Sequence, residues 1–298
     1  MSRTEPRRFA ARQVTDAVCF HGEGAVWDPR EGVLRFVDMF RGDVLAYDPN
    51  AAGKGADALV RTHVADLVVA LRPRRAGGWV LALEHGFALT EPGSWAAIPL
   101  VRILSDPSIR LNEGGCDAAG GFCCGSMAYD HRTGAGALYR LAPDGRVETV
   151  LEEVTISNGF CLDVTGSLAY YADTPTRRVD VLDVAADGAT LSHRRPFAAI
   201  EPGAGFPDGL TVDAAGGVWV ALYGGSAVRR YGPDGALDTV VTVPTPHVTS
   251  CAFGGPGLRD LFITTSQEDI DVREDRRAGA LFHAAPGVTG VAPLAFGG

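Results

Sequence analysis

The chain contains six similar units, each a turn rich in glycine, aspartate and proline followed by a short apolar run of β-forming residues. The runs begin 43 to 50 residues apart, which agrees with the ~40–50 residues of a four-stranded propeller blade. They begin at Leu34, Trp79, Phe122, Leu168, Val218 and Leu261. Six such units nearly fill the 298 residues. The repeat therefore predicts an all-β fold, a six-bladed β-propeller with four-stranded blades round a central channel.

A second β signal follows most of the runs, a strand that ends in Pro-Asp-Gly or Asp-Gly, as in 136–145 and 227–235. Such turns supply the positive φ that a tight hairpin needs. No segment has a sustained helical period, and a β-sandwich has no reason to repeat at this spacing. We expect residues 1–298 to form a single propeller domain. Residues 1 to about 12 form either a loose extension or a strand that closes the ring on the last blade.

The charge balance disfavours several classes of partner. The chain carries 27 basic and 36 acidic residues, a net charge of −9, which disfavours nucleic acid and an anionic membrane surface. No apolar run approaches the ~20 residues of a membrane span, and no signal peptide is recognisable, so we expect a cytoplasmic protein. Six cysteines without a C-x-x-C pair are expected to be buried, reduced thiols. A closed ring leaves no free sheet edge, which favours a monomer or a weak homo-oligomer.

Four polar residues recur at about the period of the repeat, where a loop enters a predicted inner strand. Glu23, Asn112, Asn158 and Asp208 are each followed by glycine within two residues. In a propeller these positions converge at the central channel. Carboxylate and amide oxygens suit Ca²⁺, Mg²⁺ or Mn²⁺ better than zinc. Any one Asn-Gly or Asp-Gly pair is also a common turn, but four at matched positions favour a shared site.

The motifs GEGAVWD, RLNEGGCDAAGGFCCGSMAYD, SNGFCLD and FPDGLTVDAAGGVWVAL, in this order, resemble those of the senescence marker protein/gluconolactonase family of sugar lactonases. The resemblance extends from about Val18 to the C-terminal GALFHAAPGVTG. It implies a six-bladed propeller with one divalent cation in the channel. Glu23, Asn158 and Asp208 would be its protein ligands. The resemblance leaves the ion open among Ca²⁺, Zn²⁺, Mg²⁺, Mn²⁺ and Fe²⁺.

The same resemblance implies a substrate site beside the cation. Asn112 would help to hold substrate, and Arg110 would hydrogen-bond its oxygens. Asp130 stands where the family often has a glutamate that contacts sugar hydroxyls, and its shorter side chain makes that contact less certain. Glu113 stands where the family usually has aspartate, and the resemblance implies a place for it just outside the ligands of the cation. The positions of two loop histidines, His21 and His247, suggest that they line the pocket mouth and move protons.

The expected function is divalent-metal-dependent hydrolysis of a small-molecule lactone, such as an aldonolactone, or a related ester. The cation would polarise the ester carbonyl, and Asp208 would bind the cation and accept a proton from the attacking water. One alternative is a phosphotriester hydrolase of the same propeller type. Another is a propeller that binds calcium or a small molecule without catalysis. Assays of lactone and phosphotriester hydrolysis, with and without added metal ions, distinguish these three functions.

Overall fold

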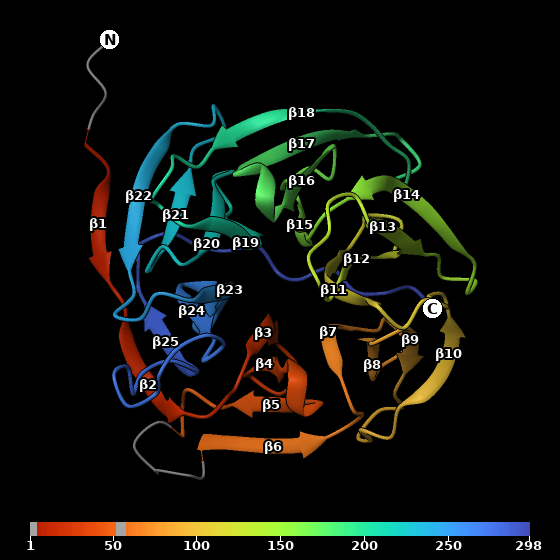
Figure 1. Cartoon of the computed structure of the whole chain (residues 1–298), viewed down its shortest axis with the longest axis horizontal. Coiled ribbons are helices and arrows are strands. Elements are labelled where there is room, and N and C mark those ends of the chain that lie inside the picture. The colour runs from red at the N-terminus through yellow and green to blue at the C-terminus, as the bar shows by residue number, and fades with distance from the viewer. Residues whose placement is uncertain (1–4, 52–57) are drawn as a thin grey trace.

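Six β-sheets surround a common axis in the computed structural model, which describes residues 5–51 and 58–298 (Figure 1). In each sheet one strand lies nearest the axis, and the others follow it outward. The predicted six-bladed β-propeller is therefore confirmed. Within the described ranges the helices are short 3₁₀ turns, and none is long and apolar enough to cross a membrane. These turns include η1 (Met39–Arg41), η3 (Thr174–Thr176) and η4 (Pro256–Leu258).

The first three blades follow one another along the chain, each with its strands in order from the axis outward. Blade 1 contains β3 (Gly22–Asp28), β4 (Val33–Asp38), β5 (Asp43–Tyr47) and β6 (Leu59–His63). Blade 2 contains β7 (Val68–Pro73), β8 (Trp79–Leu83), β9 (Gly86–Leu89) and β10 (Ile98–Arg102). Blade 3 contains β11 (Ile109–Cys116), β12 (Phe122–Ala128), β13 (Gly136–Leu141) and β14 (Val147–Val154).

The remaining blades complete the ring, and two of them include strands from the N-terminus. Blade 4 contains β15 (Ser157–Leu162), β16 (Leu168–Asp173), β17 (Arg178–Val184) and β18 (Leu191–Ala199). Blade 5 contains β19 (Phe206–Val212), β20 (Val218–Tyr223), β21 (Ala227–Tyr231), β22 (Leu237–Thr242) and β1 (Arg7–Ala10). Blade 6 contains β23 (Val248–Gly254), β24 (Asp260–Thr265), β25 (Ala280–Ala284) and β2 (Arg12–Ala17).

The N-terminal strands close the ring. Strand β2 pairs antiparallel with β25, so the outermost strand of the last blade comes from the start of the chain. Strand β1 pairs parallel with β22 and adds a fifth strand to blade 5 (Figure 1). The first described strands thus link blades 5 and 6 from the outside, which covers two outer edges that would otherwise be exposed.

The six apolar runs of the repeat form the second strand of each blade, namely β4, β8, β12, β16, β20 and β24. These strands are largely buried, because each lies between two strands of its own blade and packs against neighbouring blades. Every residue of β12, for example, is buried. The repeat in the sequence is therefore the pattern of the propeller's core.

Aromatic residues pack between neighbouring blades. Trp27 stacks on Phe262 with ring centroids 6.0 Å apart, which joins blade 1 to blade 6. Trp219 meets Phe253 edge to face at 5.5 Å, which joins blade 5 to blade 6. The six cysteines, all within the described ranges, are free, and all except the half-buried Cys161 are buried.

Candidate metal centre and substrate site

The innermost strand of every blade contains one irregularity at the same level of the propeller. In each blade the pairing register between the first and second strand shifts once. The shifts lie between Glu23 and Val26, Val68 and Ala70, Leu111 and Gly114, Ser157 and Phe160, Pro207 and Leu210, and Val248 and Cys251. Such bulges redirect side chains. The four polar positions found in the sequence all fall at these bulges, which explains why they recur with the repeat.

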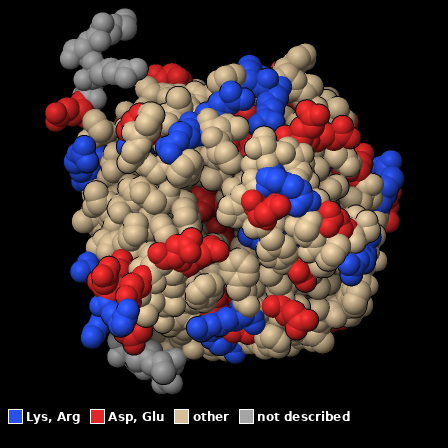
Figure 2. All heavy atoms as spheres, in the orientation of Figure 1, with Lys and Arg blue, Asp and Glu red and all other residues tan. Residues whose placement is uncertain are grey.

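Three carboxylates from different blades converge at this level. Glu23 on β3, Glu113 on β11 and Asp208 on β19 have carboxylate oxygens that all lie within 4.8 Å of one another. Each residue is at most 5% exposed. Figure 2 shows acidic atoms deep in the hollow at the middle of the face in view. The structure thus joins Glu23 and Asp208, as the sequence suggested, and adds Glu113 as a third carboxylate.

Several buried oxygens at this centre have no hydrogen-bond partner among the described residues. They are Oε2 of Glu113, Oδ1 of Asn158 and Oδ1 of Asp208. Buried polar atoms in proteins are nearly always hydrogen-bonded, so a group of unpartnered acceptors requires a separate explanation. Hard oxygen atoms gathered around one point are the donor set that Ca²⁺ or Mg²⁺ binds. The residues present therefore fit a divalent cation.

The electrostatics of the centre agree with a cation site. Burial raises the pKa of Glu23 well above its usual range, and the charges of Glu113 and Asp208 raise it further. Burial, followed by the charge of Glu113, likewise raises the pKa of Asp208. Burial raises the pKa of Glu113 to about 7, although the charge of Arg72 opposes the rise. Three close carboxylates are unfavourable together unless protons or a cation neutralise them.

The second carboxylate oxygen of Glu113, Oε1, does have partners in the protein. Its Oε1 lies 3.8 Å from Nη2 of Arg72 on β7 and accepts a 3.4 Å hydrogen bond from the hydroxyl of Ser250. Both partners come from other blades. Sequence reasoning did not select Arg72, although an arginine that ends the apolar run 67–71 was a usable signal. Ser250 lies within the bulge of blade 6, between Val248 and Cys251.

The glycines that follow the acidic and amide residues allow the inner strands to approach closely. A Cβ on Gly159 would lie 2.7 Å from the carbonyl oxygen of Asp208, and one on Gly209 would lie 2.6 Å from the hydroxyl of Ser250. Gly24 has a φ of +63° and donates its N–H to Oε2 of Glu23 at 2.7 Å. Each glycine therefore positions a site residue, either by bending the strand or by leaving room for its neighbour.

Arg110 and Asn112 form a second group beside the carboxylates. Nη1 of Arg110 donates to Oδ1 of Asn112 at 2.6 Å, and Nδ2 of Asn112 donates to the carbonyl of Ser157 at 2.9 Å. The guanidinium packs near the rings of Phe40 and Tyr129, 5.4 and 5.7 Å from their centroids. Burial lowers the pKa of Arg110, and its Nε has no hydrogen-bond partner in the described part of the chain. A buried cation with an unused donor suits a bound oxygen atom.

Both loop histidines contact the loop that follows β24. Nδ1 of His21 lies 2.9 Å from Oγ of Ser266 and 3.2 Å from Oε2 of Glu268. Nδ1 of His247 lies 2.8 Å from the carbonyl of Glu268, and its ring stacks on Tyr223 at 4.1 Å. Sequence reasoning did not select Glu268, because nothing in TTSQEDID separates it from an ordinary loop carboxylate.

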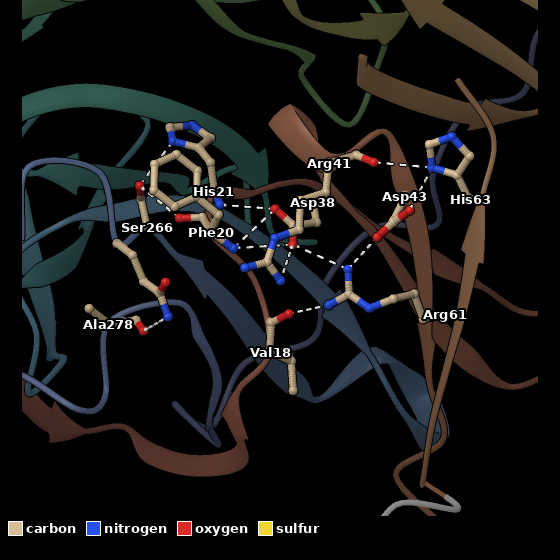
Figure 3. Close-up of polar contacts among 11 residues, drawn as sticks. Val18, Phe20, His21, Asp38, Arg41, Asp43, Arg61, His63, Ser266 and Ala278 are labelled. Carbon is tan, nitrogen blue, oxygen red and sulfur yellow. Dashed lines mark hydrogen bonds and ion pairs between the residues drawn. The ribbon is translucent and has the colours of Figure 1, made fainter. Parts of the chain in front are cut away.

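Asp38 at the end of β4 holds the backbone that carries His21. Its carboxylate accepts hydrogen bonds of 3.1 Å from the N–H groups of Phe20 and His21, and Arg61 pairs with it (Figure 3). Asp173 at the end of β16 acts in the same way on the N–H groups of Thr155 and Ile156. These aspartates therefore order the entrances to inner strands.

Asp130 lies on an exposed rim. Its carboxylate accepts hydrogen bonds from Nη1 of Arg132 at 3.1 and 3.2 Å, and its side chain is 62% exposed. The structure therefore does not bring Asp130 to the buried carboxylates. A family-like contact with sugar hydroxyls would require Asp130 to leave Arg132.

Beyond the carboxylates, further along the inner strands, lies a cavity of about 310 Å³. Its walls include Phe160, Leu210 and Phe253, together with the C-terminal segment 291–294. The chain continues from that segment across the propeller to Phe296, whose N–H donates a hydrogen bond to the carbonyl of Pro73. The chain thus covers the channel on this side, and the acidic centre lies between the cavity and the loops that carry His21 and Glu268.

The fold and the site together define a class, a six-bladed propeller with an acidic centre in its channel and a buried arginine beside it. The family model described as SMP-30/Gluconolactonase/LRE-like region matches residues 21–267. The chain belongs to this family. The family resemblance seen in the sequence is therefore confirmed.

Curated relatives match over most of their length. Regucalcin from Xenopus laevis is 33% identical, and the pentonolactonase XacC from Haloferax volcanii is 34% identical. The putative sugar lactone lactonase YvrE from Bacillus subtilis (strain 168) is 31% identical. Each alignment covers 93% of this chain and 95% of the relative.

Solved structures share the fold over nearly the whole chain. The luciferin-regenerating enzyme matches with a TM-score of 0.87 at 28% identity, over 97% of this chain and 99% of that one. A calcium-binding protein, regucalcin from Agrobacterium tumefaciens str. C58, matches with a TM-score of 0.90 at 24% identity, over 98% of this chain and 99% of that one.

Proposed function

We propose that this protein is a divalent-metal-dependent hydrolase that opens a sugar lactone. The observation that carries the proposal is the convergence of Glu23, Glu113 and Asp208 within 4.8 Å, beside a buried arginine that has an unused donor. Relatives named as a pentonolactonase and a putative sugar lactone lactonase support the same class of substrate.

The proposed cation ligands are Glu23, Asn158 and Asp208, and Glu113 is a candidate fourth. The unpartnered oxygens of Asn158, Asp208 and Glu113 support this set. Oxygen donors of this kind are typical of Ca²⁺ and Mg²⁺ sites and do not by themselves select between the two. When bound, the cation supplies a Lewis acid that polarises the ester carbonyl and stabilises negative charge on its oxygen.

The chain's own residues supply the remaining steps. Asp208, whose pKa burial raises, would accept a proton from the water that attacks the ester carbon, through the carboxylate oxygen that does not bind the cation. Arg110 would donate from Nε to a substrate oxygen, and its 2.6 Å hydrogen bond to Asn112 would hold the guanidinium in that orientation. The surrounding burial excludes bulk water and strengthens these interactions.

Hydrolysis of matched esters tests the proposal. Purified protein stripped with a chelator is assayed for proton release from glucono-1,5-lactone and from a phosphotriester, with Ca²⁺, Mg²⁺, Mn²⁺, Zn²⁺ or Fe²⁺ added back singly. We expect lactone hydrolysis that disappears with chelator and returns with at least one ion. Faster hydrolysis of the phosphotriester would favour the phosphotriesterase alternative. Binding of an ion without hydrolysis of either ester would favour a binding protein.

A further inference from the structure

We propose that Glu268, on the loop after β24, accepts hydrogen bonds from the hydroxyls of a substrate that Arg110 also contacts, and thereby selects polyhydroxylated lactones. This inference rests on the proposed lactonase function and deepens it. Glu268 would be a specificity-determining residue. The carboxylates of the metal centre would not share this role, because they are committed to the cation.

Glu268 is held at three points, two on its backbone and one on its carboxylate. The N–H of Glu268 donates to Oγ of Ser266 at 2.9 Å, and its carbonyl oxygen lies 2.8 Å from Nδ1 of His247. Its Oε2 lies 3.2 Å from Nδ1 of His21, a ring that is itself buried. Figure 3 shows the contact between His21 and the hydroxyl of Ser266, the same hydroxyl that accepts the N–H of Glu268. A loop side chain held by partners in this way can discriminate between ligands.

Glu268 also remains accessible, unlike the carboxylates of the metal centre. Its side chain is 39% exposed, whereas Glu23, Glu113 and Asp208 are at most 5% exposed. A ligand can therefore reach Glu268 without displacing protein. Its Oε2 faces His21, which leaves Oε1 as the oxygen available to accept from a ligand.

The charge of Glu268 affects the ionisation of a carboxylate at the candidate metal centre. A hydrogen bond with His21 is the main cause that lowers the pKa of Glu268, and the charges of His21 and Arg110 add to it. Burial and then Glu113 dominate the raised pKa of Asp208, and the charge of Glu268 also contributes. The contacts agree with this proximity. The ring of His21, which pairs with Glu268, meets the ring of Phe40 edge to face with centroids 5.3 Å apart, and the guanidinium of Arg110 lies 5.4 Å from the centroid of the same Phe40 ring.

The chemistry of the two side chains is complementary to a polyol. Arg110 only donates hydrogen bonds, and an ionised Glu268 only accepts them. A sugar hydroxyl can do both, so a hydroxylated ring can satisfy the two groups at once. An unsubstituted lactone has no O–H to offer Glu268. Since Asp130 is paired with Arg132 on the rim, Glu268 is the better placed carboxylate for this role.

Two lactones that differ only in hydroxyl groups provide the test. Steady-state kinetics with Ca²⁺ are measured for glucono-1,5-lactone and δ-valerolactone, in the parent protein and in Glu268→Gln. We expect the ratio of their kcat/KM values to fall about tenfold or more, mainly through KM for the sugar lactone, since hydrogen bonds to charged groups are strong. Glu274→Gln makes the same change on an exposed side chain of the same loop and should leave the ratio unchanged.

An equal loss for both lactones, or an unchanged ratio, would overturn the proposal. A binding experiment separates this result from failure of the proposed function. Calorimetric titration with glucono-1,5-lactam and δ-valerolactam, which are non-hydrolysable amide analogues, measures hydroxyl recognition without turnover. If the parent protein hydrolyses no lactone, the proposed function fails. Weaker binding of the gluconolactam by Glu268→Gln would still support hydroxyl recognition, and equal binding would overturn it.

His21 would be a positioning residue for Glu268, and a double-mutant cycle tests this. His21→Ala should raise KM for glucono-1,5-lactone in the parent protein and have little further effect in Glu268→Gln, because the carboxylate that His21 positions is already absent. Additive effects of the two substitutions would mean that His21 acts independently of Glu268, and would contradict the proposed coupling.

Discussion

Nη2 of Arg72 lies 3.8 Å from Oε1 of Glu113, so a cation from blade 2 stabilises a carboxylate of blade 3. The contact opposes the rise in the pKa of Glu113 that burial causes. It also engages Oε1, while Oε2 has no hydrogen-bond partner within the described ranges. Arg72 therefore favours the ionised form of a third carboxylate at the candidate metal centre.

Arg72→Met should weaken cation binding more at pH 7 than at pH 8.5. Loss of the positive charge would raise the pKa of Glu113 above about 7, and binding at pH 7 would then have to displace a proton. Calorimetric titration with Ca²⁺ at both pH values measures the effect. Arg273→Met, on a fully exposed side chain, is the control. An equal loss at both pH values would argue against this electrostatic role.

Asp208→Asn should abolish lactone hydrolysis and reduce cation affinity. The amide keeps the shape of the side chain but loses the charge and the proton acceptor. We expect a loss of affinity above about tenfold, the effect of losing even an outer partner of a metal site. Initial rates and Ca²⁺ titration measure the two consequences separately. Retention of both full turnover and full affinity would refute the assignment of Asp208.

The metal-free protein should lose stability as the pH rises from about 5 to 8. In the folded state burial raises the pKa of Glu113 to about 7, above the unfolded value of about 4.3. The resulting stabilisation is complete below the unfolded pKa and disappears as the pH passes through the folded pKa.

Thermal unfolding with chelator at several pH values measures this loss. Ca²⁺ at 100 times its Kd should restore about 2.7 kcal/mol at pH 8. Glu113→Gln should flatten the pH dependence without a cation. An unchanged slope in that variant would show that other groups cause the dependence.

Arg110→Lys should reduce kcat/KM for the lactone about 10- to 100-fold, because the charge remains but the planar arrangement of donors is lost. The hydrogen bond to Asn112 would also lose its geometry. Cation affinity should change little, since Arg110 is not a proposed ligand. Lactone kinetics and Ca²⁺ titration of the same preparation measure the two effects separately. A loss confined to cation affinity would contradict the proposed role of Arg110 in binding substrate.

Removal of the N-terminal strands should destabilise the ring unequally. Deletion of residues 1–17 removes β2 and exposes the edge of β25, whereas deletion of residues 1–10 leaves blade 6 with four strands. We expect a lower Tm and more aggregation for the longer deletion, because an exposed strand edge pairs with other chains. Circular dichroism and light scattering compare the two. Equal Tm values would mean that β2 contributes little to closure.

Several features of the site were predictable because they repeat. The runs that begin at Leu34 and Trp79 are second strands of their blades, and Glu23, Asn158 and Asp208 occupy equivalent bulges. A propeller places equivalent positions of different blades at one level of the channel. Repetition along the chain therefore becomes proximity in space.

Other features were not predictable from the same pattern. Glu268 lies on a loop outside the repeated positions, and its importance depends on contacts with His21 and His247 from two other segments. Asp130 was expected at the substrate site, but pairing with Arg132 holds it on the exposed rim. Loop geometry depends on partners that are distant in sequence, so local motifs do not report it.

The sequence by itself determined the blade count, the position of the largely buried second strands and the residue types at each bulge, because hydrophobic patterning and turn chemistry are local. Tertiary structure decided which of two adjacent residues at a bulge directs its side chain to the carboxylate cluster. Asn112 and Glu113 are adjacent, yet Glu113 joins the carboxylates while Asn112 binds Arg110 and the backbone of Ser157. The physical reason is that a bulge alters side-chain direction residue by residue, and contacts from other blades, such as Arg72, determine which direction is stable.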